Sequence, residues 1–379
     1  MVAKTAWNKS IRFFCTSCNK ETVPAGRPVN ICSCGTPLEV QYHWGKLNRD
    51  DSISLNEASL WRYWAVLPSV VENQRVSLGE GWTPLTKIQG TEEKVLIKDE
   101  TVNPTGSFKD RGMALAITMA EQQGIKAVCL PSAGNAGVAA AAYAQTAGIG
   151  CHVFLPESIP ASYVEMTKHY GAVVHIHGQN IAEAADKMKQ EQSIDWFDLS
   201  TLKEPFRIEG KKTLGYEIVE QLDWKFPDVI VYPTGGGTGL IGMWKAFREL
   251  IELEWVTGKL PRMVVAQSDG CAPVVKAFEQ GKSRTEKWEH NFTMALGLNV
   301  PGPLGGKWIL DTLRASNGLA VSVKETKIKA ATKHFRRVTG IPASEEAGVV
   351  WLAYQTLLKN NWIKNGEQII LFATGIRRL

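Results

Sequence analysis

The sequence predicts an α/β protein with a mainly parallel sheet, preceded by a small cysteine-rich head. Two observations carry this prediction. Short apolar runs alternate with longer helical stretches from about residue 94 to residue 375, a pattern that favours parallel strands with helices on both faces of the sheet. Four of the seven cysteines form two close pairs near the N-terminus, outside that alternation.

Composition and charge limit the classes of function. The chain has 379 residues, 44% of them hydrophobic, which is enough for two or three domains with their own cores. It contains no membrane-spanning apolar run and no signal-peptide stretch. An odd number of cysteines in a long chain favours a reducing cytoplasm over a disulfide framework. The small net charge of +5, without a basic run, predicts a small anionic ligand and neither nucleic acid nor membrane as a partner.

The head, about residues 1–45, carries four cysteines in the pattern of a metal site: Cys15, Cys18, Cys32 and Cys34. Two close pairs resemble a zinc ribbon, in which four thiolates hold one structural zinc ion. The second pair has one intervening residue where ribbons usually have two. A head without metal that folds on apolar contacts is the alternative.

The elements of the body follow in order. Residues 60–71 predict a helix ended by proline, and residues 77–88 an extended loop. Apolar runs predict strands at 94–100, 127–132, 151–156, 173–178, 228–234, 262–270 and 367–375. Helices are predicted at 110–124, 135–148, 162–171, 180–192, 211–224 and 239–256. Because ligands bind at the carboxyl ends of strands in such sheets, the loops there are the candidates for chemistry.

The first of these loops contains Lys109, within NPTGSFKDRG (103–112). Asn103, Pro104 and Gly106 predict a tight turn, and Ser107 is a candidate helix cap. Lys109 is thus expected beside a helix N-terminus, where anions are favoured and the pKa of an amine can be lowered. A lowered pKa favours a role for this amine as a nucleophile, for example in Schiff-base formation. A structural turn is the alternative.

A second loop, PSAGNAG (131–137), precedes the predicted helix at 135–148. Ser132, Gly134 and Asn135 would present backbone N–H groups, a hydroxyl and an amide at the helix N-terminus, which together can receive a carboxylate or a phenolate. A plain helix cap with small residues is the alternative.

The third loop is the most specific, and its residues are Gly235, Gly236, Gly237, Thr238 and Gly239. Successive glycines before a helix predict a phosphate cradle. The loop lacks the Lys-Ser/Thr of a nucleoside-triphosphate loop and the spacing of a dinucleotide fingerprint, so a single phosphate suits it better. Thr374, after the last strand, could meet a ring nitrogen or be an ordinary strand-end residue.

Together the groups in these loops would suit a ligand with an aldehyde, a phosphate, a ring oxygen and a ring nitrogen. Pyridoxal 5′-phosphate has all four. The chain also resembles the threonine synthase family, within the tryptophan-synthase-β-like class (fold type II) of pyridoxal-phosphate enzymes. The motifs that carry the resemblance are NPTGSFKDRG, SAGNAG, FRIEGKKT (206–213), TGGGTGL, PLGGKWILDTLRASNG (303–318) and the closing ATG.

The resemblance implies an architecture. The body, residues 46–379, is expected to form two open, mainly parallel α/β domains with the cofactor in the cleft, and to include a smaller subdomain at about 110–205. The zinc-ribbon-like head precedes it. A homodimer is also implied.

The resemblance also implies residue roles. Lys109 forms the Schiff base and moves protons, Phe108 lies beside the cofactor, and Asn135 bonds the ring hydroxyl. The 235–239 loop binds the cofactor phosphate, and Thr374 faces the pyridine nitrogen. Expected substrate ligands are Ser132, Ala133 and Gly134 for the carboxylate, and Arg207, Lys211 and Thr213 for a phosphate.

The implied reaction is γ-elimination of phosphate from O-phospho-L-homoserine, followed by addition of water at the β-carbon to give L-threonine. Three departures from the family leave the cofactor residues intact: Asn299, where relatives tend to carry arginine; Glu345 and Glu346, where small residues are usual; and the ending TGIRRL, which differs from relatives after its Thr-Gly. They leave open a serine/threonine dehydratase, a β-replacement enzyme such as cysteate or diaminopropionate synthase, or a catalytically silent pyridoxal-phosphate-binding protein.

Overall fold

The computed structural model of the chain describes residues 11–22, 30–68, 70–88 and 94–378. Within these ranges the chain forms two compact units. Unit 1 comprises the described residues up to Gly81, residues 109–211 and Arg378; unit 2 comprises residues 82–108 and 212–377. The chain passes from unit 2 to unit 1 between Phe108 and Lys109.

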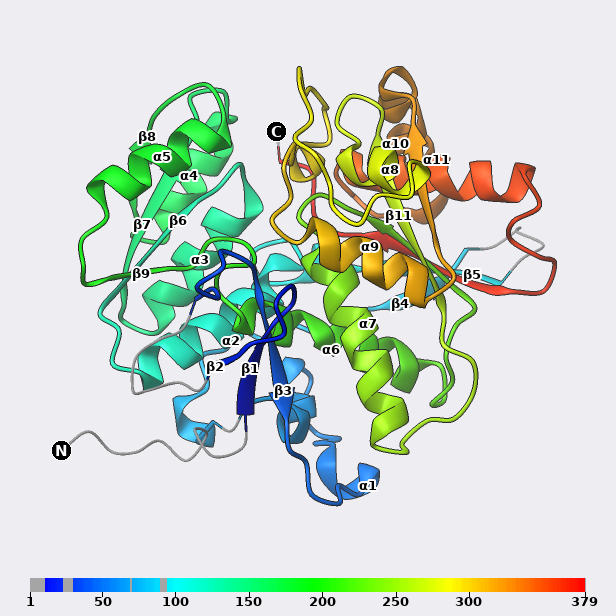
Figure 1. Cartoon of the computed structure of the whole chain (residues 1–379), viewed down its shortest axis with the longest axis horizontal. Helices are drawn as coiled ribbons and strands as arrows, with labels where there is room; N and C mark the ends of the chain where they lie inside the picture. Colours follow the sequence, from blue (N-terminus) through cyan, green and yellow to red (C-terminus); the bar gives the residue numbers. More distant parts are fainter. Residues whose placement is uncertain (1–10, 23–29, 69, 89–93, 379) are drawn as a thin grey trace. The chain divides into compact units, whose positions relative to one another are not determined.

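Unit 1 contains a four-stranded parallel sheet of order β8-β7-β6-β9 (Figure 1). Its strands are β6 (Ala127–Pro131), β7 (Gly150–Leu155), β8 (Val173–Ile176) and β9 (Trp196–Asp198). Its longer helices are α2 (Lys109–Gln122), α3 (Asn135–Thr146), α4 (Ala161–His169) and α5 (Ile181–Glu191).

Helices cover both faces of this sheet. Val128 and Leu130 of β6 belong to a large apolar cluster that includes Met113 of α2 and the alanines of α3. Cys129, between them, packs instead with Met188 of α5. Because successive side chains of a strand point to opposite faces, α3 and α5 lie on opposite sides of β6.

The described part of the head forms a three-stranded antiparallel sheet of order β2-β1-β3. Its strands are β1 (Ile11–Cys15), β2 (Glu21–Thr22) and β3 (Leu38–Tyr42). Alternate residues of β1 and β3, such as Phe13 and Val40, are buried in the same cluster as α2 and α3. The head therefore shares the main core of unit 1. Shorter helical segments of this unit are α1 (Arg49–Ser52), η2 (Leu60–Val66) and η3 (Glu72–Gln74).

Unit 2 contains a six-stranded sheet of order β12-β11-β10-β13-β5-β4, parallel except for β4 at the edge. Its strands are β4 (Leu85–Lys87), β5 (Lys94–Asp99), β10 (Val229–Pro233), β11 (Arg262–Ser268), β12 (Leu319–Val323) and β13 (Gln368–Ala373). Its helical elements are η4 (Glu100–Val102), α7 (Thr238–Glu252), α8 (Pro273–Glu279), η5 (Leu296–Leu298), α9 (Gly306–Ala315), α10 (Glu325–Thr339) and α11 (Glu345–Lys359). Helix α6 (Phe206–Gln221) begins in unit 1 and continues into unit 2.

The predicted α/β fold, its seven strands and its six helices are confirmed. Residues 60–66 form a tighter 3-10 helix that ends before Pro68, and residues 85–87 of the expected loop form a short strand. The alternation did not predict β9, β12 or the helices after residue 272. Among the described residues, no helix is both long enough and apolar enough to cross a membrane.

Candidate functional site

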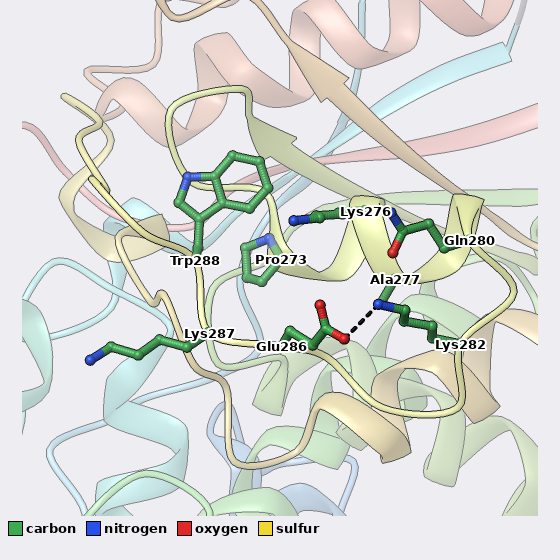
Figure 2. Close-up of a pocket in the computed structure, with 8 residues that line it drawn as sticks. All are labelled: Pro273, Lys276, Ala277, Gln280, Lys282, Glu286, Lys287 and Trp288. Atoms are coloured by element: carbon green, nitrogen blue, oxygen red, sulfur yellow. Dashed lines mark hydrogen bonds and ion pairs between the residues drawn. The ribbon is translucent and has the colours of Figure 1, made fainter.

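Unit 2 has a surface pocket (Figure 2). Its lining residues are Pro273, Lys276, Ala277, Gln280, Lys282, Glu286, Lys287 and Trp288. Two of its lysines already have partners: Lys282 pairs with Glu286 at 2.5 Å, and the Lys276 ammonium lies 5.9 Å from the centre of the Trp288 ring. None of the residues predicted for chemistry lines it.

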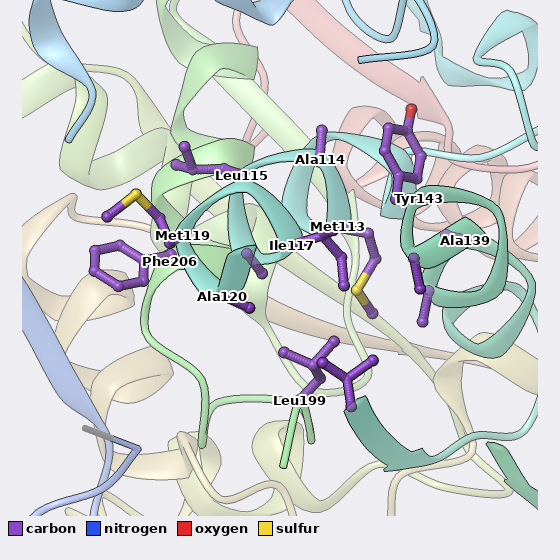
Figure 3. Packing of buried hydrophobic residues seen from close by; sticks show 14 of the residues in the cluster. Met113, Ala114, Leu115, Ile117, Met119, Ala120, Ala139, Tyr143, Leu199 and Phe206 are labelled. Carbon is purple, nitrogen blue, oxygen red and sulfur yellow. The ribbon is translucent and has the colours of Figure 1, made fainter. Parts of the chain in front are cut away.

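Lys109 begins helix α2, which is held firmly in unit 1. Figure 3 shows Met113, Ile117 and Met119 of this helix in one apolar cluster with Leu199 and Phe206. All three α2 side chains are fully buried, whereas Lys109 itself is half-buried. The lysine thus stands on a rigid element and keeps part of its side chain accessible.

The turn before Lys109 is bound to the end of β13 in unit 2. The N–H of Phe108 donates to the carbonyl of Thr374 at 3.1 Å, and Ser107 pairs with Gly375 in an isolated β-bridge. Gly106 adopts a φ of 76°, which the turn requires and which favours glycine. Two predicted cofactor residues, Phe108 and Thr374, are therefore brought together although 266 positions separate them in the sequence.

The Ser132–Asn135 loop forms the start of α3 in unit 1. The Ser132 hydroxyl accepts hydrogen bonds from the N–H groups of Gly134, at 3.2 Å, and Gly137, at 2.9 Å. Asn135 and Ala136 are the first helical residues, and N–H groups at these positions have no acceptor within their own helix. Since Ala133 and Asn135 are half-buried, this positive helix end is accessible.

Arg378 is a candidate that the sequence analysis missed. Its Nε donates to Oδ1 of Asn135 at 3.2 Å, and its guanidinium lies 5.7 Å from the centre of the Tyr163 ring. That ring also covers Gly134, where an added Cβ would lie 3.2 Å from Cε1 of Tyr163. Arg378 therefore places a cation beside the loop predicted to receive an anion.

The glycine loop precedes α7 in unit 2 and is closely packed. Gly237 is the N-cap, with a left-handed φ of 80°. An added Cβ would lie 2.4 Å from the carbonyl oxygen of Gly297 at Gly235, and 2.0 Å from the Tyr232 hydroxyl at Gly239. At these positions only glycine fits, so the backbone itself forms the surface at the N-terminus of α7.

Arg207 and Lys211 form a buried cationic pair in unit 1. Arg207 donates from Nη1 to the carbonyl of Leu199 at 2.5 Å, and its Nε and Nη2 have no hydrogen-bond partner within the part of the chain that is described. Burial lowers the pKa of Arg207 to about 10. Burial, followed by the charges of Arg207 and Lys109, lowers the pKa of Lys211 well below its usual value. Thr213, also buried, falls in unit 2.

Three of the residues expected to depart from the family, Asn299, Glu345 and Glu346, have partners within unit 2. Glu346 accepts from the N–H of Gly297 at 2.7 Å, and Gly297 is the residue whose carbonyl covers Gly235. Glu345 pairs with Arg336 at 3.3 Å. The Asn299 side chain accepts from Asn291 at 2.7 Å. Glu346 thus supports the segment that packs on the glycine loop.

The four head cysteines converge, with their sulfur atoms all within 4.8 Å of one another. The remaining three, Cys129, Cys151 and Cys271, are buried elsewhere. The head is thus the one place, among the described residues, where histidine, cysteine or acidic side chains gather in a group that could hold a metal ion.

Comparison with known proteins gives consistent results. The sequence model of the family described as "Pyridoxal-phosphate dependent enzyme" matches residues 76–375. The threonine synthase of Methanocaldococcus jannaschii is 32% identical over 371 residues, which cover 95% of this chain and 91% of that protein. The threonine synthase of Methanosarcina acetivorans is 33% identical over 370 residues, covering 95% and 90%.

Solved structures share the fold. Maize serine racemase matches with a TM-score of 0.67 and 22% identity, over 77% of this chain and 87% of that one. Threonine deaminase isoform 2 from Solanum lycopersicum matches with a TM-score of 0.67 and 19% identity, over 94% and 95%. At these identities the likeness establishes the fold alone.

Proposed function

Since the chain belongs to the family of pyridoxal-phosphate-dependent enzymes, we propose that it acts as a threonine synthase. Phosphate leaves the γ-carbon of O-phospho-L-homoserine, and water then adds at the β-carbon to give L-threonine. The observation that supports a phosphorylated substrate is the buried Arg207, with two nitrogens that lack a protein partner among the described residues. The charges of Glu204 and Asp198 favour the charged guanidinium, and a leaving phosphate would supply acceptors for its two remaining nitrogens.

The residues present fit the cofactor. The backbone of the 235–239 loop suits its phosphate because glycines without Cβ atoms stand at a helix N-terminus. The amine of Lys109, the amide of Asn135 and the hydroxyl of Thr374 suit its aldehyde carbon, ring hydroxyl and ring nitrogen. When bound, pyridoxal phosphate supplies an electron sink that stabilises negative charge on a substrate carbon.

The remaining roles belong to the chain's own groups. The Lys109 amine moves protons between substrate carbons, as a general base and then as a general acid. The N–H groups at the start of α3 receive the substrate carboxylate. Arg207 and Lys211 hold the leaving phosphate in a dry environment, where charge-assisted hydrogen bonds are strong. A neutral hydroxyl at Thr374 would leave the ring nitrogen less protonated than a carboxylate would, so Lys109 would carry more of the proton transfer.

The test compares substrates on the purified chain. We expect phosphate release from O-phospho-L-homoserine to equal L-threonine formation and to be faster than ammonia release from L-serine or L-threonine. Arg207→Met keeps an unbranched apolar stem and removes the charge, so it should raise KM for the phosphorylated substrate about a hundredfold. Faster ammonia release from L-serine would identify a dehydratase instead. Cofactor binding without turnover of any of these substrates would support the silent alternative.

Lys109→Ala should lower turnover by several orders of magnitude, because it removes both covalent attachment and the proton-moving group. Borohydride reduction of the holoenzyme followed by peptide mapping should find the cofactor on Lys109. A matched control is Lys126→Ala, at an exposed lysine of the same unit, which should leave turnover unchanged. A reduced adduct on any other lysine would contradict the assignment.

A further inference from the structure

We propose that the head binds one structural zinc ion through Cys15, Cys18, Cys32 and Cys34, and that this ion holds the beginning of helix α6 in place. The first part stands on the geometry of the sulfur atoms alone. The second part rests on the proposed function, because α6 carries Arg207 and Lys211.

The distances between sulfur atoms fit a tetrahedral ion. The Sγ atoms of Cys15 and Cys34 are 3.4 Å apart, those of Cys18 and Cys32 are 3.7 Å apart, and all four lie within 4.8 Å of one another. A disulfide needs about 2.0 Å. Four sulfurs bound to zinc at about 2.3 Å lie roughly 3.8 Å apart at the corners of a tetrahedron. The cluster is therefore too open for disulfides and close to the size of a zinc site.

Two turns bring these sulfur atoms together. Cys15 ends β1, and the N–H groups of Ser17 and Cys18 point to its Sγ at 3.4 and 3.3 Å. In the second turn, the N–H of Gly35 donates to the carbonyl of Cys32 at 2.8 Å, with a φ of 80° at Gly35. That left-handed glycine lets Cys32 and Cys34 serve one site although a single residue separates them.

A hydroxyl supports the sulfurs from outside the cluster. Oγ1 of Thr36 lies 2.9 Å from Sγ of Cys15 and 3.0 Å from Sγ of Cys34. Hydrogen bonds to metal-bound thiolates orient them and tune metal affinity, so Thr36 occupies the place of an outer partner. Four cysteines leave no open coordination position, which makes the ion structural and not catalytic.

The described part of the head contacts the start of α6 and the residues before it, all inside unit 1. The Phe13 ring of β1 lies 5.8 Å from that of Phe206, edge to face, and Tyr42 of β3 donates to Glu209 at 2.6 Å. Asn30 donates to the carbonyl of Asp198 at 2.6 Å. Asp198 immediately precedes Leu199, whose carbonyl accepts from Arg207. A head fixed by zinc therefore fixes both the start of α6 and the carbonyl that orients the guanidinium.

The first experiment measures metal on the full chain, purified under reducing conditions. We expect about one zinc per chain, and a tetrahedral tetrathiolate spectrum after cobalt replaces the zinc. Cys18→Ser and Cys34→Ser change the exposed members and should lower zinc content about tenfold, whereas the control Cys271→Ser, in unit 2, should retain it. Thr36→Val should weaken zinc about tenfold in competition with a chelator. Protein that binds neither zinc nor cobalt, carries disulfides in the head or holds iron instead would overturn the zinc site.

The second experiment tests the link to α6. Metal-free protein should keep its cofactor absorbance, while KM for O-phospho-L-homoserine rises about tenfold and kcat changes less. An unchanged KM in metal-free protein would overturn the link and leave the zinc site standing. If the chain does not use this substrate at all, the proposed function fails, but zinc content and the cobalt spectrum still decide the metal site.

Discussion

At the scale of single residues, Arg378 shows how a side chain far along the sequence can orient another. Its Nε donates to Oδ1 of Asn135, so the NH₂ group of Asn135 remains the donor that this side chain can offer to an acceptor. In the proposed function that acceptor is the ring hydroxyl of the cofactor. Arg378 is then a positioning residue, and it lies in the part of the sequence that departs from the family.

We expect Arg378→Ala to weaken cofactor affinity about tenfold, because Asn135 loses a charge-assisted hydrogen bond. Arg378→Lys should restore part of the cofactor affinity. Equilibrium dialysis measures the affinity, and the absorption spectrum of the bound cofactor reports on its ring hydroxyl. Arg377→Ala is the control, since that side chain is exposed. Equal affinities for the Arg377 and Arg378 variants would remove Arg378 from this role.

Glu80 is a buried acid whose ionisation bears on stability. It accepts from the N–H of Leu78 at 2.9 Å and from the Tyr143 hydroxyl at 2.8 Å, and burial raises its pKa from 4.5 to about 7. A carboxyl with a raised folded pKa contributes stability that is fully present below its unfolded pKa and lost as pH rises through the folded pKa.

We therefore expect the free energy of unfolding to fall between about pH 5 and pH 8, and Glu80→Gln to reduce that fall. The amide is close in shape to the protonated acid, so the variant should match the parent near pH 5 and exceed it near pH 8. Part of the fall in unfolding free energy should remain in this variant, because Glu204 is also buried and has a pKa of about 7. Denaturant titrations at several pH values measure the free energy of unfolding, and Glu121→Gln, at an exposed position, is the control. Parallel pH profiles for the parent and Glu80→Gln would refute the assignment.

At the scale of elements, the loop before α7 combines two demands on glycine. Gly237 needs its left-handed conformation to begin the helix, and Gly235 and Gly239 need to be small because neighbouring atoms occupy the position of a Cβ. The same backbone is proposed to bind the cofactor phosphate. A carboxylate placed there would meet phosphate as a like charge.

Gly236→Asp should accordingly weaken the cofactor roughly tenfold or more, so that dialysis releases it. Gly302→Asp is a matched control, because it adds the same charge to unit 2 at a glycine with open space around it. Cofactor retained equally by both variants would place the phosphate elsewhere.

At the scale of the whole molecule, the head and the substrate segment share one core in unit 1. The buried residues of β1 and β3 belong to the same cluster as α2, α3 and Phe206. The apolar residues of the head strands should therefore keep part of their packing when metal leaves. The two cysteine turns bury little surface and should loosen, so that Asn30 loses its hold on Asp198 and the strands hold Phe206 and Glu209 less tightly.

Removing zinc should lower the melting temperature by about 5 °C or more, while cofactor absorbance at 25 °C remains. Thermal scans of zinc-loaded and chelated holoenzyme measure the melting temperature, and absorbance read during chelation shows whether the cofactor remains. Cys18→Ser should melt like the chelated parent, with or without added zinc. Loss of cofactor absorbance in step with zinc release would instead connect the metal directly to the cofactor.

Much of the fold was predictable because its signals are local. The runs that became β5, β6, β7, β8, β10, β11 and β13 are short, apolar and bounded by turn residues, and each is readable within about ten positions. The helices after residue 272 were not predicted, and the first of them, α8, spans only seven residues, which is too short for a clear helical period. The candidate loops were found in the same local way, from glycines and small residues at strand ends.

The sequence by itself determined the strand-helix alternation, the turn before Lys109, the glycine loop and the two close pairs of cysteines along the head. Each follows from residues that are neighbours along the chain. Only the tertiary structure decided that β13 lies beside β5, which binds Thr374 to Phe108, and that Arg378 meets Asn135. It alone also decided how close the four sulfur atoms come. These contacts depend on which apolar faces bury one another, and no local pattern records that choice.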